Sequence, residues 1–172
     1  MKRFLSLIIL TVLLSACSFG TLHPTLFNNK VVNLVKPATL AVEESAVTYN
    51  SLVPNDTTEL TEIDTSQLRI DFDEAEDLLE EAAKALTYES EDLEQQATIR
   101  GHLDTYLLAG EEYLDAYESM LLYFEAAENQ TDPNKLDTLD PNLHTAYNTF
   151  TEANNDLVTS LAEFVTEEES TI

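Results

Sequence analysis

The residue types that most often carry chemistry are scarce in this chain, which has three histidines and one cysteine among 172 residues. A di-iron site in a helical bundle needs the pattern Glu-x-x-His, because residues three apart share a helix face and can bind one metal. The residues three positions before His102 and His144 are Ile99 and Pro141, and the zinc pattern His-Glu-x-x-His is absent from the sequence. His23 lies beside a proline, where we expect it to be exposed. The sequence therefore predicts no metal site built on histidine.

Nucleophilic catalysis has equally little support. The sequence contains no Gly-x-Ser-x-Gly motif and only three glycines, whereas catalytic loops and phosphate cradles use glycine for unusual backbone angles. The stretch TDPNKLD offers Asp132, Asn134 and Asp137, but it lacks the central Gly and the distant bidentate Glu of a calcium loop. Asp and Asn are also ordinary turn residues. We therefore predict that the protein is not an enzyme, with no catalytic residues, no metal site and no cofactor.

Carboxylates are abundant instead. The chain has 33 Asp and Glu against 8 Lys and Arg, a formal net charge of −25. This balance argues against nucleic acid as a partner, because phosphates are bound by basic surfaces, and against electrostatic binding to anionic lipid headgroups. Positively charged partners and divalent cations are compatible with it. The simplest interpretation is that the charge keeps an exposed protein soluble.

The single cysteine, Cys17, follows the most apolar run of the chain. Lys2 and Arg3 precede an almost entirely apolar stretch at 4–14, and small residues follow it. A basic start, an apolar centre of roughly 7–15 residues and a small-residue end are the three parts of a secretory signal. The stretch is also shorter than the roughly 20 apolar residues that a membrane-spanning helix needs. We therefore expect residues 1–16 to be a signal peptide that is removed, which would also make the chain more acidic by two charges.

The residues Leu14-Ser15-Ala16-Cys17 resemble the lipobox of bacterial lipoproteins, in which an apolar residue and two small residues precede a lipidated cysteine. The resemblance implies cleavage before Cys17 and attachment of a diacylglyceride to its sulfur. Acyl chains such as palmitate then act as a lipid anchor, because they bury at roughly 0.8 kcal/mol per CH₂. The alternatives are a cysteine that is removed with the signal and a free thiol.

The residue after the cysteine bears on localisation. In bacteria with two membranes, an Asp at this place tends to retain a lipoprotein at the inner membrane, so Ser18 implies the outer membrane. In bacteria with one membrane, the same signal implies the outer face of the cytoplasmic membrane. We expect residues 17–35 to be the lipidated Cys and a tether, because Gly20, Pro24 and the pair Asn28-Asn29 interrupt regular structure.

Beyond the tether, apolar residues recur at steps of three and four, which predicts amphipathic helices. The first helix is expected to begin with Pro37 in its first turn and to end at Pro54. The second and third are expected at 66–88 and 91–128, with Ser90 capping the third, and one continuous helix from about 66 to 128 is the alternative. Four of the seven tyrosines lie between 106 and 123, and we expect them in the core.

A loop at 129–140 is expected to precede the last helix, with Asp140 as its N-cap and Pro141 as its first residue. With no strand pattern in the sequence, the predicted fold is all-α: an up-and-down bundle of about four helices over 36–168, after the signal peptide and tether. The stretch 146–164 resembles uncharacterised YiiG-like helical lipoproteins. This resemblance implies a relationship to that family and indicates no mechanism.

The sequence thus predicts a lipid-anchored, acidic helical protein of the bacterial cell envelope that acts as a binding or structural module. The expected partners are the membrane, through the lipid on Cys17, and an envelope protein or divalent cations, with no nucleic acid. The alternative function is a cation-binding surface lipoprotein that uses clustered carboxylates, for instance around the helix expected at 66–88.

Overall fold

The structure, a computed structural model, describes residues 24–53, 63–88, 97–126 and 133–169. Four helices make up nearly all of this part of the chain: α2 (Pro24–Leu52), α3 (Ser66–Tyr88), α5 (Ala97–Glu125) and α6 (Pro133–Glu169). The described residues contain no strand. The predicted all-α fold is therefore confirmed.

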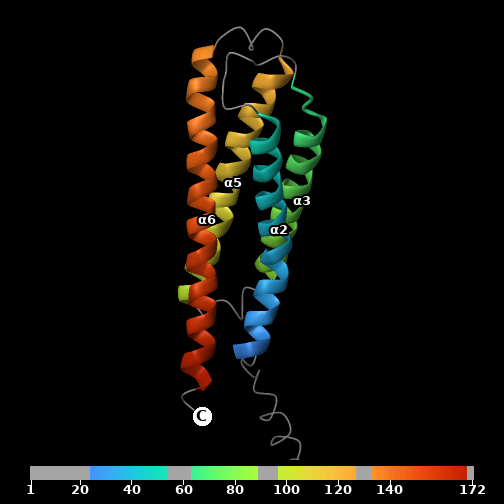
Figure 1. Cartoon of the computed structure of the whole chain (residues 1–172). Coiled ribbons are helices and arrows are strands. Elements are labelled where there is room, and N and C mark those ends of the chain that lie inside the picture. The colour runs from blue at the N-terminus through green and yellow to red at the C-terminus, as the bar shows by residue number, and fades with distance from the viewer. Residues whose placement is uncertain (1–23, 54–62, 89–96, 127–132, 170–172) are drawn as a thin grey trace, which may run out of the picture.

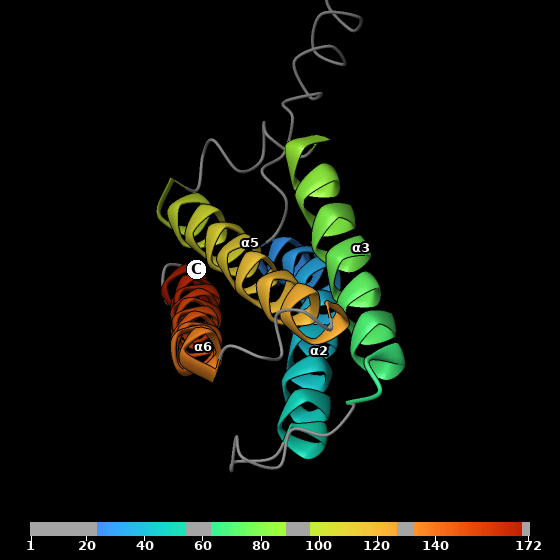
Figure 2. The same cartoon turned by 90° about the horizontal axis from the view of Figure 1, so that it is seen from above.

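The helices run side by side along one axis and alternate in direction (Figure 1). Each packs against its two neighbours, in the order α2, α3, α5, α6 and back to α2, and the closest pairs are α2 with α3 and α5 with α6. Seen from above, α5 lies between α3 and α6 (Figure 2). The molecule is thus an up-and-down bundle made of two tightly packed helical hairpins, which contact each other less closely.

The first helix begins earlier than its sequence predicts. Helix α2 starts at Pro24 and contains Pro37 in its interior, so the prediction that residues 24–35 form a tether and that the helix begins near Pro37 is wrong. Val31 and Val35 are buried and extend the apolar stripe of α2 backwards. Pro37 itself is exposed, so water can reach the carbonyl that loses its usual N–H partner. Packing of the stripe outweighs the helix-breaking tendency of the proline.

The last helix shows the same effect. Helix α6 starts at Pro133 and runs through Pro141, so the predicted loop over 133–140 and the predicted N-cap at Asp140 are wrong. Leu136 is buried and lies one heptad before the buried Leu143, on the same helix face. Pro133 takes the first helical position, where a missing N–H has no cost.

The connection between α3 and α5 falls at residues 89–96, which lie outside the described residues, as does the predicted cap Ser90. The alternative of one continuous helix from 66 to 128 is nevertheless excluded. Gly110 of α5 packs on Leu79 of α3, so closely that a Cβ added to the glycine would lie 2.8 Å from Leu79 Cδ2. In a single helix these two residues would be roughly 45 Å apart at about 1.5 Å per residue.

The predicted helical phase is confirmed by burial. Leu79 and Leu121 are 5% and 1% exposed, whereas Asp77 on the opposite face is exposed. Asp71 is only 6% exposed, although the acidic residues that follow it on α3 are exposed. Gln67, one turn earlier, donates a hydrogen bond of 2.6 Å to its Oδ1, which offsets part of the cost of burying a carboxylate.

Candidate functional site

Helix α5 presents a row of tyrosines to the interior. Tyr106, Tyr113 and Tyr117 follow each other at seven and four residues, which places them on one helix face, and each is at most 1% exposed. Their hydroxyls cross the bundle diagonally to α2. The Tyr106 hydroxyl lies 2.9 Å from Thr39 Oγ1, and the Tyr113 hydroxyl lies 2.7 Å from Ser45 Oγ. We call these three tyrosines and their two α2 partners the tyrosine seam.

Every hydroxyl of the seam has a hydrogen-bond partner. Ser45 Oγ donates to the Val42 carbonyl at 2.8 Å, so it accepts the hydrogen bond from Tyr113. The Tyr106 hydroxyl is also 3.2 Å from the Val35 carbonyl, and the Tyr117 hydroxyl is 3.4 Å from the Ser45 carbonyl. Because buried polar groups are costly unless paired, these bonds allow three phenols to lie in the core. The prediction that the tyrosines of this segment are core residues is confirmed.

The seam does not offer acid–base chemistry near neutral pH. Burial raises the pKa of Tyr106 to about 12, and it raises the pKa of Tyr113 and Tyr117 further above the ordinary value of 10.0. Phe72 stacks on the Tyr117 ring at 6.0 Å, and Phe150 lies 5.1 Å from the Tyr106 ring. Neutral, enclosed rings of this kind stabilise the bundle and have no access to a substrate.

Tyr49 forms a smaller polar cluster with the last helix. Its hydroxyl donates to Asp140 Oδ1 at 2.7 Å, and the His144 ring packs against it in a T-shaped arrangement, with the two ring centroids 6.2 Å apart. Burial and the Asp140 carboxylate raise the pKa of Tyr49. The adjoining cavity is about 20 Å³, which is room for about one water molecule. This cluster therefore joins α2 to α6 and is too small to bind a ligand.

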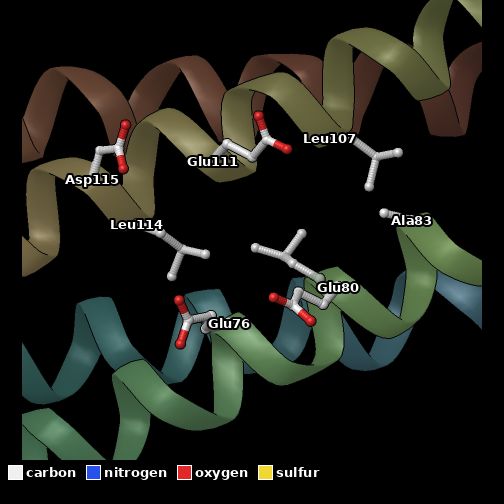
Figure 3. Close-up of a pocket in the computed structure, with 8 residues that line it drawn as sticks. Glu76, Glu80, Ala83, Leu107, Glu111, Leu114 and Asp115 are labelled. Atoms are coloured by element: carbon white, nitrogen blue, oxygen red, sulfur yellow. The ribbon is translucent and has the colours of Figure 1, made fainter.

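The other flank of α5 borders a surface groove. The groove lies between α3 and α5, is open to solvent and has a volume of about 220 Å³ (Figure 3). Its floor is apolar and its rim is acidic. The floor consists of Leu79, Ala83, Leu107 and Leu114, and the rim consists of Glu76 and Glu80 from α3 with Glu111 and Asp115 from α5. We call this site the α3–α5 groove.

Most of the negative charge on the rim is not balanced by ion pairs among the described residues. Lys84 forms an ion pair with Glu80, one turn away on the same helix, and this carboxylate raises the pKa of Lys84. Within the described residues, Glu76, Glu111 and Asp115 form no ion pair. The groove thus sets a leucine floor between two rows of solvated negative charge, an arrangement suited to a ligand that is both apolar and cationic.

The described residues contain no group of three or more His, Cys, Asp or Glu side chains placed to hold a metal ion. His102 is half-buried on α5 and His144 is exposed on α6. Asp137, from the stretch weighed as a calcium loop, is an exposed helical residue, while Asp132 lies outside the described residues. Cys17, the one site residue that the sequence predicts, also lies outside them, as does His23.

The sequence did not distinguish the groove floor from the core. Leu107 and Leu114 belong to the apolar stripe expected for this helix, yet both are only half-buried because the tyrosines occupy the side of α5 that faces α2. A signal was present in the sequence. Glu111 and Asp115 interrupt the stripe at a spacing of four, directly beside its leucines, and a face that were fully buried would not carry two carboxylates.

Comparison of the chain with protein-family models, with curated proteins and with solved structures gives no match. In the described part of the chain, no helix is both long and apolar enough to cross a membrane. What the protein does is therefore inferred from its own sequence and geometry.

Proposed function

We propose that this protein is a lipid-anchored lipoprotein of the bacterial cell envelope that acts as a binding or structural module, with the α3–α5 groove as its binding surface. The observation that carries the proposal is the groove itself, in which half-exposed leucines lie between rows of carboxylates. Apolar surface with a polar rim is typical of interaction sites.

The anchor part of the proposal depends on the lipobox resemblance at Cys17. The N-terminal end of α2 lies at the same end of the bundle as the C-terminal end of α6 (Figure 1). The residues between Cys17 and Pro24 span at most about 25 Å when extended, so a lipid on Cys17 would hold this end of the bundle near the membrane. The groove would then face sideways into the envelope, at the outer membrane or on the outer face of a single membrane.

Fractionation of cells that make Cys17→Ser tests the anchor. We expect the wild-type protein to pellet with membranes. Cys17→Ser should lose lipid-mediated attachment, because it removes the sulfur that would carry the diacylglyceride, and at least two acyl chains are needed for stable anchoring. Ser18→Thr is the matched control, since it changes the next residue and leaves the sulfur in place. A Cys17→Ser protein that has lost its signal and still pellets after a high-salt wash would show that Cys17 is not the anchor.

The second candidate function is binding of divalent cations. It is favoured by the four carboxylates that flank one groove, because carboxylate oxygens are ligands for Ca²⁺. Dialysis against a chelator followed by thermal melting separates the two functions. A loss of stability that Ca²⁺ restores at constant ionic strength, and that Mg²⁺ or NaCl does not, would favour cation binding. Equal effects of all three salts at equal ionic strength would indicate screening of diffuse repulsion.

A further inference from the structure

We infer that the occupant of the α3–α5 groove is a basic amphipathic helix, a partner segment with one apolar stripe flanked by Lys or Arg. The inference rests on the proposed binding role of the groove and adds the chemical class of its partner. It is carried by the size of the groove, its floor and the spacing of its rim charges.

The size of the groove favours inserted side chains over an enclosed small molecule. Small-molecule sites usually occupy roughly 300–1,000 Å³ and enclose most of the ligand, whereas this groove has about 220 Å³ and is partly open to solvent. A shallow trough between two helices is the surface into which a third helix places a row of side chains.

The floor has the period of a helix surface. Leu107 and Leu114 lie one heptad apart on α5, with Gly110 between them in contact with Leu79 of α3. The glycine lets the two helices approach closely, so Leu107 and Leu114 form one continuous apolar floor with Leu79. A partner helix with apolar residues at steps of three and four would fit between these leucines as ridges fit into grooves.

The rim supplies charge complementarity in the same register. Glu76 and Glu80 are four residues apart on α3, and Glu111 and Asp115 are four residues apart on α5. In each pair, the Cα atoms are about 6 Å apart along the helix axis. Lys or Arg residues at four-residue spacing on both flanks of a partner's apolar stripe would meet these two rows. Three of the four carboxylates have no ion-pair partner among the described residues.

A simple cation would use only half of this arrangement. A divalent ion or a polyamine would meet the carboxylates and leave Leu107 and Leu114 exposed to water, and the described residues show no cluster that would hold a metal ion. A neutral apolar helix would cover the leucines and desolvate the carboxylates without pairing them, which is costly. A basic amphipathic helix satisfies both the floor and the rim.

The test measures binding of a designed peptide to the full-length protein in phosphatidylcholine nanodiscs, with empty nanodiscs as the blank. The probe is a labelled peptide of Leu and Lys, about four helical turns long, with its leucines on one face. A scrambled peptide of the same composition is the control ligand, and anisotropy reports binding. We expect the amphipathic peptide to bind more tightly than the scrambled one.

Two matched double variants separate the groove from the general acidity of the protein. Glu76→Gln/Glu111→Gln removes one charge from each side of the rim. Asp77→Asn/Glu112→Gln removes the same number of charges from the neighbouring exposed residues, which do not line the groove. We expect the groove pair to raise the Kd roughly five- to tenfold, because two exposed ion pairs are lost, and the control pair to raise it less than about twofold.

A third comparison tests the floor. Leu107→Gln should weaken binding, whereas Leu40→Gln, at a residue of α2 that is 52% exposed and outside the groove, should not. A thermal melt checks that each variant is folded, and the charge variants decide the question if Leu107→Gln is not.

Four outcomes would overturn the inference. Equal weakening by the two double variants would show that the peptide follows net charge, and equal binding of the scrambled peptide would show that helical amphipathicity is irrelevant. Saturable binding of spermine or Ca²⁺ that depends on Glu76 and Glu111, with no binding of the peptide, would leave the groove as a binding surface and make its occupant a simple cation. If none of these probes binds, both the inference and the binding role of the groove are wrong, whereas the anchor is tested separately by fractionation.

Discussion

The two flanks of α5 carry different kinds of side chain. Toward α2, the helix presents tyrosines whose rings are buried and whose hydroxyls are paired with Thr39 and Ser45. Toward α3, it presents leucines that stay half-exposed beneath solvated carboxylates. Both flanks are apolar in sequence, and each faces another helix of the bundle. They differ in that only the first flank is closed.

The difference follows from side-chain reach. A tyrosine is long enough to cross the diagonal of the bundle, and its hydroxyl finds a partner on the far helix, so the seam joins the two hairpins through their centre. Leucine is shorter and carries no polar end, and Leu107 and Leu114 stay only partly buried beside α3. The seam therefore supplies stability and specificity to the fold, and the groove is left available for an external partner.

The largest expected effect comes from truncating the seam. Tyr113→Ala should lower the free energy of unfolding by about 3–5 kcal/mol, because it removes a buried ring and the hydrogen bond that Tyr113 donates to Ser45 Oγ. Leu107→Ala should cost about 1–2 kcal/mol, because the half-exposed leucine loses less buried surface. Urea unfolding measures both values. Equal losses would contradict the distinction between a closed flank and an open one.

High pH should lower the stability of the fold through the seam tyrosines, and the groove residues should not affect this dependence. The pKa of Tyr106 is raised by burial to about 12 in the fold, against an ordinary value of 10.0. The folded state therefore holds its phenolic protons more tightly than the unfolded chain. The stability from this shift is fully present below about pH 10 and falls as pH rises toward about 12, by up to about 1.4 kcal/mol per pH unit for each such tyrosine.

Urea unfolding at a series of pH values between about 9 and 12 checks this dependence. Tyr106→Phe should flatten the fall, since it removes one titrating group, while Leu107→Ala should leave its slope unchanged. A fall of the same steepness in Tyr106→Phe would show that Tyr106 does not contribute to the loss of stability at high pH.

A pair of glycine substitutions sharpens the description of the groove floor. Gly101→Ala should stabilise the protein by about 0.5–1 kcal/mol, because alanine favours helix and no atom lies within 4 Å of the new methyl group. Gly110→Ala has the same helix-propensity gain but places its Cβ 2.8 Å from Leu79 Cδ2, so α3 or Leu79 must shift. We expect the second variant to be less stable than the first by about 1 kcal/mol or more.

Thermal melts of the two glycine variants, recorded side by side, make this comparison. Equal stabilisation by both would mean that α3 lies farther from α5 than the contact of Leu79 with Gly110 indicates, and that the groove is correspondingly wider.

The smallest expected effect concerns salt. With 33 Asp and Glu against 8 Lys and Arg, most carboxylates cannot be paired and repel one another over about 10 Å at 0.1 M ionic strength. Raising NaCl should therefore increase the melting temperature gradually. Glu76→Gln/Glu111→Gln should reduce this dependence slightly, by relieving repulsion across the rim. A decrease in melting temperature with added NaCl would indicate that attractive ion pairs dominate instead.

Much of the bundle could be predicted from the period of its apolar residues. The steps of four and three at Leu68, Phe72, Ala75 and Leu79 predict the buried face of α3, and all four side chains are buried. The starts of α2 and α6 could not be predicted in the same way. Local rules assign Pro37 and Pro141 to first turns, and only the distant packing of Val35 and Leu136 shows that both prolines lie inside helices.

Glu111 and Asp115 signal that this face of α5 is not fully buried, but the sequence does not locate the groove, for a related reason. A stripe of leucines and tyrosines specifies that a helix face is apolar, but it does not specify which side chains meet a neighbour. Leu107 and Tyr106 are adjacent in sequence, and only the positions of α2 and α3 decide that the tyrosine is enclosed and the leucine is not. Asp71 illustrates the reverse case, since its burial depends on a tertiary environment that its acidic neighbours on α3 do not share.

The hydrogen bonds of the seam also determine how the helices can be aligned lengthwise. In a core of leucines alone, one helix can slide past another by a turn and find a similar row of side chains. Here a slide of α5 by one turn, about 5.4 Å, would separate Tyr106 from Thr39 and Tyr113 from Ser45 at the same moment. Each buried hydroxyl left unpaired would cost about 1–3 kcal/mol. The seam therefore favours one lengthwise alignment of α5 with α2. Because α3 packs closely on α2, a fixed alignment of α5 with α2 also helps to hold the carboxylates of α5 opposite those of α3.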